Sequence, residues 1–438
     1  MNFGQAIFGR LLTTSEQQAV SVQKRSKATS KGLNTSADGV RRVEGSGKCV
    51  RTACVRLELL DPAAHEKLAA TQRLYAQVCN FVVPTVAADR TKRLWQRFTL
   101  HHAVYDKIKA KFPDLGSQYA CNVIRSVSAA YKTELAKHPA QLKSEDKKLK
   151  TLVFRHPSVH VDKNTLTFFP DGTVSISTIS GRIRARLCPG PFQKELLASG
   201  KRKECNLVLH PRRGRKEAFW ELHIAVESQG CSGEEHLKNL KADEIMGIDV
   251  GENNIAAVST GRIWKAGVLK DKRDRYMSQR KRLQRNGSQS ARQHLKKASG
   301  RERRHVTHVN NVVSKEIVQE AAKRGIKLIA LEDLTHIRDH IKAGKRIRSR
   351  LHRWSFRELQ EMIVYKAAAA GIRCVFLDPR YTSQTCSQCG APGKRHKHGF
   401  RCSQCGHLAH SDLNASRNLQ GLCRQLSAQG LKIGRAHV

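Results

Sequence analysis

CSQCGAPGKRHKHGFRCSQCGHLAHSDLNASRN, residues 386–418, contains two Cys-x-x-Cys pairs separated by a basic loop of 12 residues. An acid, Asp412, follows the second pair almost at once. This spacing is typical of four thiolates that hold one tetrahedral Zn²⁺ ion. Four protein ligands close the coordination shell, so we expect one structural zinc and no chemistry at it. The predicted ligands are Cys386, Cys389, Cys402 and Cys405.

Four histidines lie in or beside this ribbon: His396, His398, His407 and His410. They are surplus to a four-cysteine shell, although a site of three cysteines and one of these histidines stays open as an alternative. The loop between the pairs, residues 391–401, is basic, and we expect it to face phosphate groups.

Two apolar segments upstream end in acids, as buried strands next to a catalytic edge do. IMGIDV places Asp249 at the end of one run, and IKLIALEDL places Glu332 at the end of another. With Asp412 at the start of a helix, three carboxylates are expected to meet at one sheet edge, where two Mg²⁺ ions would support phosphodiester hydrolysis. Asp333 is an alternative ligand, but it would point to the opposite face from Glu332. Asn414 and Asn418 are either helpers of this site or ordinary helix-surface residues.

The order of elements around these acids favours an RNase H-like α/β domain. Three strands from residue 245, long helices over 271–324, a strand, a helix, a strand and a last helix follow one another. We assign this nuclease domain to 244–380 and 411–424, with the zinc ribbon over 381–410 inserted and a tail over 425–438. The order Asp, Glu, Asp disfavours a transposase that joins DNA ends, for which Asp, Asp, Glu is expected.

The first half of the chain predicts a second fold. Residues 50–60 alternate as a strand, 61–145 carry helical spacing, and period two returns from 152 with turn residues between short runs. We therefore expect a small β-barrel over 50–60 and 146–230, interrupted by a helical insertion over 61–145. Residues 1–49 are rich in basic and small polar residues and are expected to form a disordered arm, with an organelle presequence as the competing interpretation.

The charge of the chain indicates its partners. It carries 80 Lys and Arg against 37 Asp and Glu, a formal net charge of +43. Such an excess calls for a polyanion, and nucleic acid is the obvious one. Residues 262–304 alone hold 16 basic and 3 acidic side chains, which suits a surface that follows a nucleic-acid backbone. No apolar run reaches about 18 residues, and 13 cysteines do not form an even disulfide framework, so we expect an intracellular protein with no membrane partner.

These motifs resemble the TnpB family of transposon-encoded RNA-guided nucleases, which are related to compact type V CRISPR effectors. GIDVG, IALEDL and HSDLNASRNL are similar to its three RuvC motifs, and YTSQTCSQCG (381–390) is close to a hallmark of the family. RWSFRELQEMIVYKAAAAGI (353–372) also resembles the family. The similarity is weaker before residue 245, where VRLELLDPAAHEKLAATQRLYAQVCNFV (55–82) and FWELHIAVE (219–227) match, and residues 1–48 are extra.

The resemblance implies an architecture and an activity. The barrel would be a WED domain, its insertion a helical REC domain, and the last part a RuvC nuclease with a zinc ribbon. Asp249, Glu332 and Asp412 would be the catalytic triad. A monomer would bind a guide RNA from the transposon end, recognise a short motif, and cut target double-stranded DNA as a Mg²⁺-dependent endonuclease. The protein would act in the cytoplasm of a prokaryotic cell, in association with the nucleoid.

Two alternatives stay open alongside this expectation. A compact type V CRISPR effector would carry the same motifs. A guided DNA-binding regulator with little cleavage is disfavoured because all three acids are present.

Overall fold

The computed structural model describes residues 40–44, 48–89, 91, 93–138, 149–211, 217–229, 239–334 and 355–429. Most of the expected arm and the end of the expected tail lie outside these residues. The chain divides into two compact units, which we describe separately: one runs over 50–228 and the other over 229–438, with β1 as an added strand. No described helix is both long and apolar enough to cross a bilayer.

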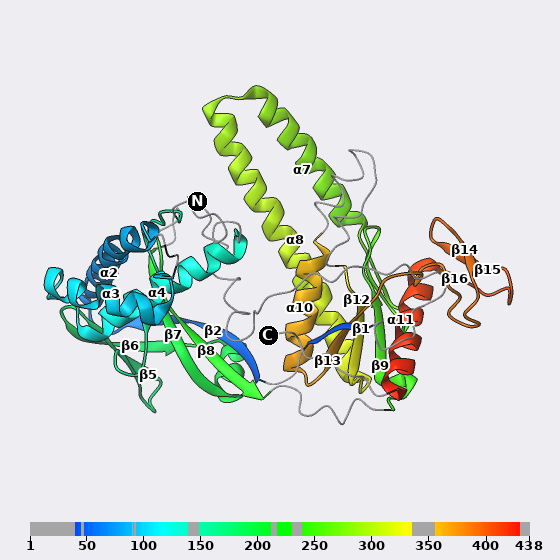
Figure 1. Ribbon diagram of the computed structural model, residues 1–438, viewed down its shortest axis with the longest axis horizontal. Coiled ribbons are helices and arrows are strands. Elements are labelled where there is room, and N and C mark those ends of the chain that lie inside the picture. Colours follow the sequence, from blue (N-terminus) through cyan, green and yellow to red (C-terminus); the bar gives the residue numbers. More distant parts are fainter. Residues whose placement is uncertain are drawn as a thin grey trace. The chain divides into compact units, whose positions relative to one another are not determined.

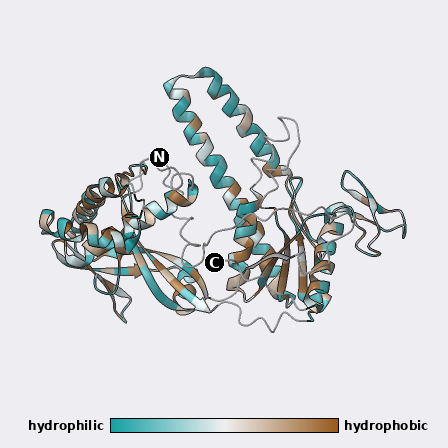
Figure 2. Ribbon diagram, in the orientation of Figure 1, coloured by the Kyte–Doolittle hydropathy of each residue, from teal (hydrophilic) through white to brown (hydrophobic). Residues whose placement is uncertain are grey.

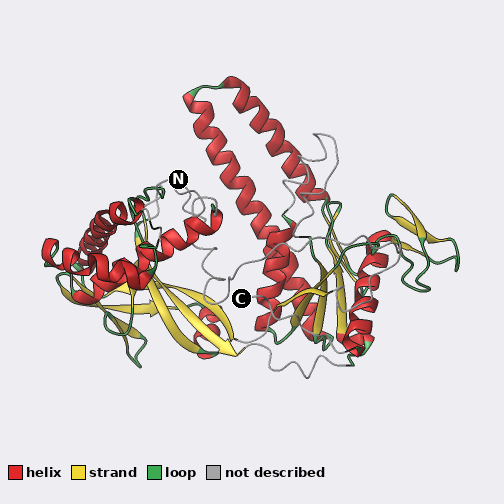
Figure 3. Ribbon diagram, in the orientation of Figure 1, coloured by secondary structure: helices red, strands yellow, loops and turns green. Residues whose placement is uncertain are grey.

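The first unit is built on a seven-stranded sheet of order β3-β7-β8-β2-β6-β5-β4. Among the described strands, the hydrogen-bonded order ends at β3 and β4, so these strands do not close into a complete barrel. Figure 3 shows helices packed beside these strands. The strands are β2 (Lys48–Leu59), β3 (Val159–Val161), β4 (Leu166–Phe168), β5 (Thr173–Thr178), β6 (Gly181–Cys188), β7 (Lys201–His210) and β8 (Phe219–Gln229).

In the described part of this unit, the helices beside the sheet are α2 (Ala64–Ala87), α3 (Arg97–Lys111), α4 (Ser117–Lys137) and the shorter α6 (Pro191–Ala198). Helices α2 to α4 fall between β2 and β3 along the chain, within the expected insertion. One core joins them to the strands, because Tyr75 and Tyr131 of the helices are fully buried together with Trp220 and Ile176 of the sheet.

The second unit is a six-stranded mixed sheet of order β1-β13-β12-β9-β10-β11. Strands β9, β12 and β13 are parallel to one another, while β10, β11 and β1 run antiparallel to their neighbours. The strands are β1 (Val40–Glu44), β9 (Ile245–Asp249), β10 (Asn254–Val258), β11 (Ile263–Lys265), β12 (Leu328–Glu332) and β13 (Arg373–Leu377).

Helices cover both faces of this sheet (Figure 1). On β12, Ile329 packs with α8 and α10, whereas Ala330 packs with α11 on the opposite face. Both faces are therefore buried, which explains why these strands appear in the sequence as continuous apolar runs without polar alternation. The helices are α7 (Gly267–Asn286), α8 (Gln289–Lys323), α10 (Phe356–Ala369) and α11 (Ser411–Ala428), and a single 3₁₀ turn, η3 (Ala242–Glu244), precedes β9.

Helix α11 lies directly on β9, and a glycine makes this close approach possible. A Cβ atom placed on Gly247 would lie 1.9 Å from the carbonyl oxygen of Ser416 in α11. Only a residue without a side chain leaves room for the helix backbone there. This packing fixes the start of α11, and with it Asp412, over the end of β9.

Helices α7 and α8 form a long antiparallel pair that extends away from the sheet (Figure 1). Figure 2 shows that the pair is largely hydrophilic, in contrast to the apolar strands. Arg280 of α7 pairs with Glu302 of α8 at 3.2 Å, so one of the few acids in this segment holds the two helices together. The expected pair of basic helices is therefore present, with Gly287 in a left-handed conformation at their junction.

Two boundary expectations are corrected. Residues 40–44 were expected in the disordered arm, but they form β1, which pairs with β13 and covers what would otherwise be an open sheet edge. Their sequence, VRRVE, is too short and too basic to predict a strand without knowledge of that partner. The tail was expected from 425, but α11 continues to Ala428 because Leu422, Cys423 and Leu426 remain buried against the sheet.

Candidate active site and zinc ribbon

The three predicted acids lie at one edge of the second sheet. Asp249 is the last residue of β9 and Glu332 the last residue of β12, and these strands are parallel neighbours, so their ends coincide. Asp412 is the second residue of α11, which packs on β9. Glu332 and Asp412 are 9% and 7% exposed, and Asp249 is partly exposed. The structure thus brings together residues that are 163 positions apart along the chain.

Polar neighbours hold two of these carboxylates in place. Thr382 donates a hydrogen bond from Oγ1 to Oε1 of Glu332 at 2.6 Å. Asn254 donates from Nδ2 to Oδ2 of Asp412 at 2.8 Å. The other oxygen of Asp412 accepts from Nη2 of Arg395 at 3.3 Å. Each carboxylate is therefore oriented by residues from other elements, as a site that must bind ions in a fixed geometry requires.

Burial and the repulsion between neighbouring carboxylates raise the pKa values of Asp249 and Glu332. Burial, together with the charges of Glu332 and Asp412, raises the pKa of Asp249 well above its usual range, while Arg395 opposes this shift. Burial also raises the pKa of Glu332 to about 7, against the hydrogen bond from Thr382. A cluster of acids that resists ionisation by itself is suited to bind cations, which would restore the charged forms.

In the metal-free protein, the free energy of unfolding should fall as pH rises from about 4.5 towards 7. In that window Asp249 and Glu332 hold protons in the folded state that they lose when unfolded, so raising the pH favours unfolding. Thermal melting of chelated wild type and Asp249→Asn at about pH 5 and about pH 8 checks this. The variant should melt above wild type at the higher pH; an identical pH dependence of both proteins refutes the expectation.

The four cysteines form the second site. Their sulfur atoms all lie within 4.8 Å of one another, with Cys386 and Cys405 at 3.6 Å and Cys389 and Cys402 at 3.5 Å. Tetrahedral zinc with Zn–S bonds of about 2.3 Å places sulfurs about 3.8 Å apart, so the residues fit the ion. Hydrogen bonding from the Cys405 amide lowers the pKa of the Cys402 thiol to about 6, whereas the neighbouring thiols raise the pKa of Cys405. A bound zinc ion would hold all four as thiolates.

The ribbon is formed by three short strands: β14 (Gly393–His396), β15 (Gly399–Cys402) and β16 (Leu408–His410). None of the nearby histidines belongs to the sulfur cluster within the described part of the chain. His410 instead caps α11, since its Nδ1 accepts from the amide of Asp412 at 3.2 Å. The alternative with three cysteines and one histidine is therefore not favoured by the geometry.

Asn414 and Asn418 connect the helix of Asp412 to the ribbon. Asn414 is fully buried; its Nδ2 donates to the carbonyl of Thr385 at 2.7 Å and its Oδ1 accepts from the amide of Ser387 at 2.9 Å. Asn418 donates to the carbonyls of Thr382 and Thr385. They are not helix-surface residues: they fix the segment that carries Thr382 and leads to Cys386.

Arg395, Thr382 and Asn254 were not singled out from the sequence as site residues. Arg395 lay in the loop expected to face phosphate, yet its guanidinium lies beside Asp412. Thr382 and Asn254 carry no pattern of their own, because each acts through a single tertiary hydrogen bond. The only sequence signal for these residues is that each lies close to a predicted strand end or to the ribbon.

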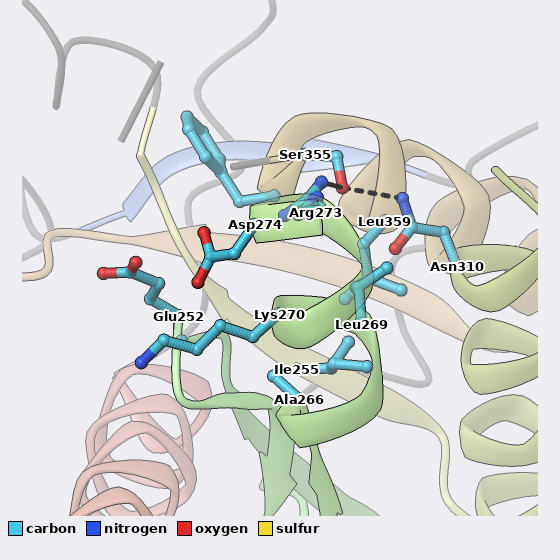
Figure 4. Close-up of a pocket in the computed structure, with 12 residues that line it drawn as sticks. Glu252, Ile255, Ala266, Leu269, Lys270, Arg273, Asp274, Asn310, Ser355 and Leu359 are labelled. Atoms are coloured by element: carbon cyan, nitrogen blue, oxygen red, sulfur yellow. Dashed lines mark hydrogen bonds between the residues drawn. The ribbon is translucent and has the colours of Figure 1, made fainter. Parts of the chain in front are cut away.

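A pocket lies beside the turn that follows Asp249, lined by that turn, α7 and α10 (Figure 4). In it, Arg273 and Asn310 both donate to Oγ of Ser355, at 3.2 and 3.0 Å. These bonds anchor the base of the basic helix pair close to the acidic edge.

Comparison with known proteins finds matches to two family models and to several relatives. Residues 223–338, which include Asp249 and Glu332, match the family model described as a probable transposase. Residues 356–419, which include the four cysteines and Asp412, match the model described as the Cas12f1-like TNB domain. A TnpB-like protein of Methanocaldococcus jannaschii is 33% identical over 195 residues, which cover 40% of this chain and 68% of that protein. The chain belongs to the TnpB-like family.

Other relatives of this TnpB-like chain are CRISPR-associated endodeoxyribonucleases named Cas12f1. That of Sulfoacidibacillus thermotolerans is 43% identical over 113 residues, 25% of each chain. That of Syntrophomonas palmitatica is 28% identical over 214 residues, 44% of this chain and 41% of the relative. The matched segments therefore span well under two thirds of these two relatives.

Solved structures show the same fold as this TnpB-like chain. A Cas12f1–sgRNA–target DNA complex gives a TM-score of 0.58 at 14% identity, covering 82% of this chain and 83% of that chain. The mini-RNA-guided endonuclease CRISPR-Cas_phi3 gives 0.51 at 10% identity, covering 86% and 93%. The resemblance derived from the motifs is thus confirmed at the level of family and fold.

Proposed function

We propose that this protein is an RNA-guided DNA endonuclease of the TnpB kind, which cleaves target double-stranded DNA next to a short motif. The observation that carries the proposal is the convergence of Asp249, Glu332 and Asp412 at one buried sheet edge, in a chain of net charge +43. The relatives support it, since they are named endodeoxyribonucleases and TnpB-like proteins.

We infer that the acidic edge holds two Mg²⁺ ions. The three acids offer only oxygen donors, which suit this hard cation. A bound cation would also relieve the repulsion by Glu332 and Asp412 that helps to raise the pKa of Asp249. When bound, such ions activate a water molecule and stabilise the leaving oxygen of a phosphodiester.

The surrounding residues have distinct roles in this proposal. Thr382 orients Glu332, and Asn254 orients Asp412. Arg395 maintains a positive charge next to Asp412, where the phosphate of the DNA strand would have to lie. The zinc ribbon does no chemistry; it folds the β14–β15 hairpin that carries Arg395.

Exposed basic side chains of the α7–α8 pair provide a surface for a nucleic-acid backbone. We propose that the first unit acts as the WED domain with its REC helices, that the protein works as a monomeric ribonucleoprotein, and that it acts at the prokaryotic nucleoid. Exposed members of the basic surface are Arg275, Lys281, Arg282, Arg285, Arg292 and Lys296.

The bound RNA tests this proposal. When the protein is expressed together with the DNA that flanks its gene, it should co-purify with one discrete RNA, because a guide must have a fixed scaffold. Sequencing identifies the RNA, and its genomic position distinguishes a transposon end from a CRISPR array. Expression without the flanking DNA is the control. Random RNA fragments in both preparations count against a guided mechanism.

A further inference from the structure

A second group of metal-ligand side chains lies on the sheet of the first unit, far along the chain from the acids and cysteines described above. Glu221 and His223 are two residues apart on β8 and project from the same face. In the β7–β8 register, Val208 lies opposite Glu221 and His210 lies opposite Phe219, so His210 is the diagonal neighbour of Glu221.

The three side chains converge on one point. Nε2 of His210 lies 2.7 Å from Oε2 of Glu221, and Nε2 of His223 lies 3.3 Å from the same oxygen. All three ligand atoms fall within 4.8 Å of one another. Ligands of one zinc ion stand about 2.0–2.2 Å from the metal, so small side-chain rotations bring this group into coordination distance.

The group is partly shielded and its geometry is supported by its neighbours. The side chains of His210, Glu221 and His223 are 36%, 22% and 11% exposed. The ring of His210 stacks on Phe219 with centroids 4.7 Å apart and an interplanar angle of 11°. Stacking restricts the orientation of the imidazole, which lowers the entropy lost when it binds an ion. The guanidinium of Arg56 lies 4.9 Å from the centroid of the Phe219 ring, so a metal ion at this site would have a positively charged neighbour.

We propose that His210, Glu221 and His223 bind one divalent ion of the borderline transition series, with Zn²⁺ as the expected occupant. Two imidazoles and one carboxylate are a donor set that suits zinc, whereas Mg²⁺ prefers oxygen ligands alone. The ion connects β7 to β8, and water completes its shell. This site is independent of the proposed nuclease activity, because no residue of it belongs to the acidic edge or to the ribbon.

Metal content of the full-length protein tests the proposal. After equilibrium dialysis against Zn²⁺ with a large excess of Mg²⁺, which occupies the proposed ion site of the three acids, and removal of free ion, wild type should hold two zinc ions per chain by plasma mass spectrometry. The double variant His210→Ala/His223→Ala should hold one, as should Cys402→Ser, which affects the ribbon only. Glu227→Gln is the matched control. It alters a different acid of β8, which pairs with Lys203, and this variant should hold two zinc ions per chain.

One zinc per chain in both wild type and the double variant overturns the proposal. Because the double variant can fold poorly, Glu221→Gln provides a second test: it preserves the size and shape of the side chain, removes its charge and replaces one acceptor oxygen with an NH₂ donor. It should weaken zinc binding at this site at least about tenfold and abolish the zinc-dependent rise in melting temperature that this site contributes. Undiminished zinc affinity in folded Glu221→Gln likewise overturns the assignment.

Discussion

Replacing Asp249 with asparagine should abolish cleavage of a guide-matched DNA duplex while leaving RNA and target binding close to wild type. The negative charges of Glu332 and Asp412 both act on Asp249, and its carboxylate is the ligand that the end of β9 contributes to the proposed ion site. Loss of one charged ligand removes several kcal/mol of transition-state stabilisation, so we expect the cleavage rate to fall at least about a thousandfold. Nuclease assays and gel-shift titrations on the same preparation measure the two effects.

Asp333→Asn is the matched control for this experiment. Asp333 follows Glu332 directly, but β12 ends at Glu332 and the amide of Asp333 pairs with the carbonyl of Leu377. The control should cut at nearly the wild-type rate. Retained cutting by Asp249→Asn, or equal loss in both variants, would show that the acids have been assigned incorrectly.

Replacing Cys402 with serine should remove one zinc ion per chain and unfold the ribbon. Cys402 is 1% exposed, and the apolar cluster that the described residues form around it contains Cys386 and Phe400 with Ala391 against them. So small a core cannot order three short strands, and the metal must supply the missing stability. We expect a lower melting temperature and, because β14 carries Arg395, a loss of cleavage as well.

Ser403→Ala serves as the control next to this cysteine. Its hydroxyl makes one exposed hydrogen bond to the carbonyl of Pro392, so its removal should cost less than about 1 kcal/mol and leave the zinc in place. If Cys402→Ser kept its full zinc content, the four-cysteine shell would be wrong.

The sequence predicts the parts of the site that follow from periodicity and spacing. Asp249 and Glu332 end continuous apolar runs, and parallel buried strands place such ends at the same sheet edge. The two Cys-x-x-Cys pairs specify their ligands through spacing alone, and the structure gathers the same four sulfurs. The roles of the acids stay predictions until the variants are tested.

Features that depend on a tertiary partner could not be predicted. β1 exists because β13 offers an edge, and VRRVE carries no apolar pattern that would reveal it. Arg395 is one of several basic residues in its loop, and only the fold of the ribbon selects it for Asp412. In the sequence, Asn414 and Asn418 have the pattern of polar surface positions in a helix. In the structure they are buried, because the segment that leads into the ribbon packs against α11.

The central claim is that a bound RNA directs the three acids to a DNA target. It is tested most directly by incubating the purified ribonucleoprotein and Mg²⁺ with two plasmids, one bearing the sequence that matches the co-purified RNA and one with that sequence scrambled. Our account predicts double-strand breaks in the matching plasmid alone, and none with Asp249→Asn. Binding of the matching plasmid without any cleavage by wild type would contradict it and would favour a guided regulator, and equal cleavage of both plasmids would contradict RNA guidance.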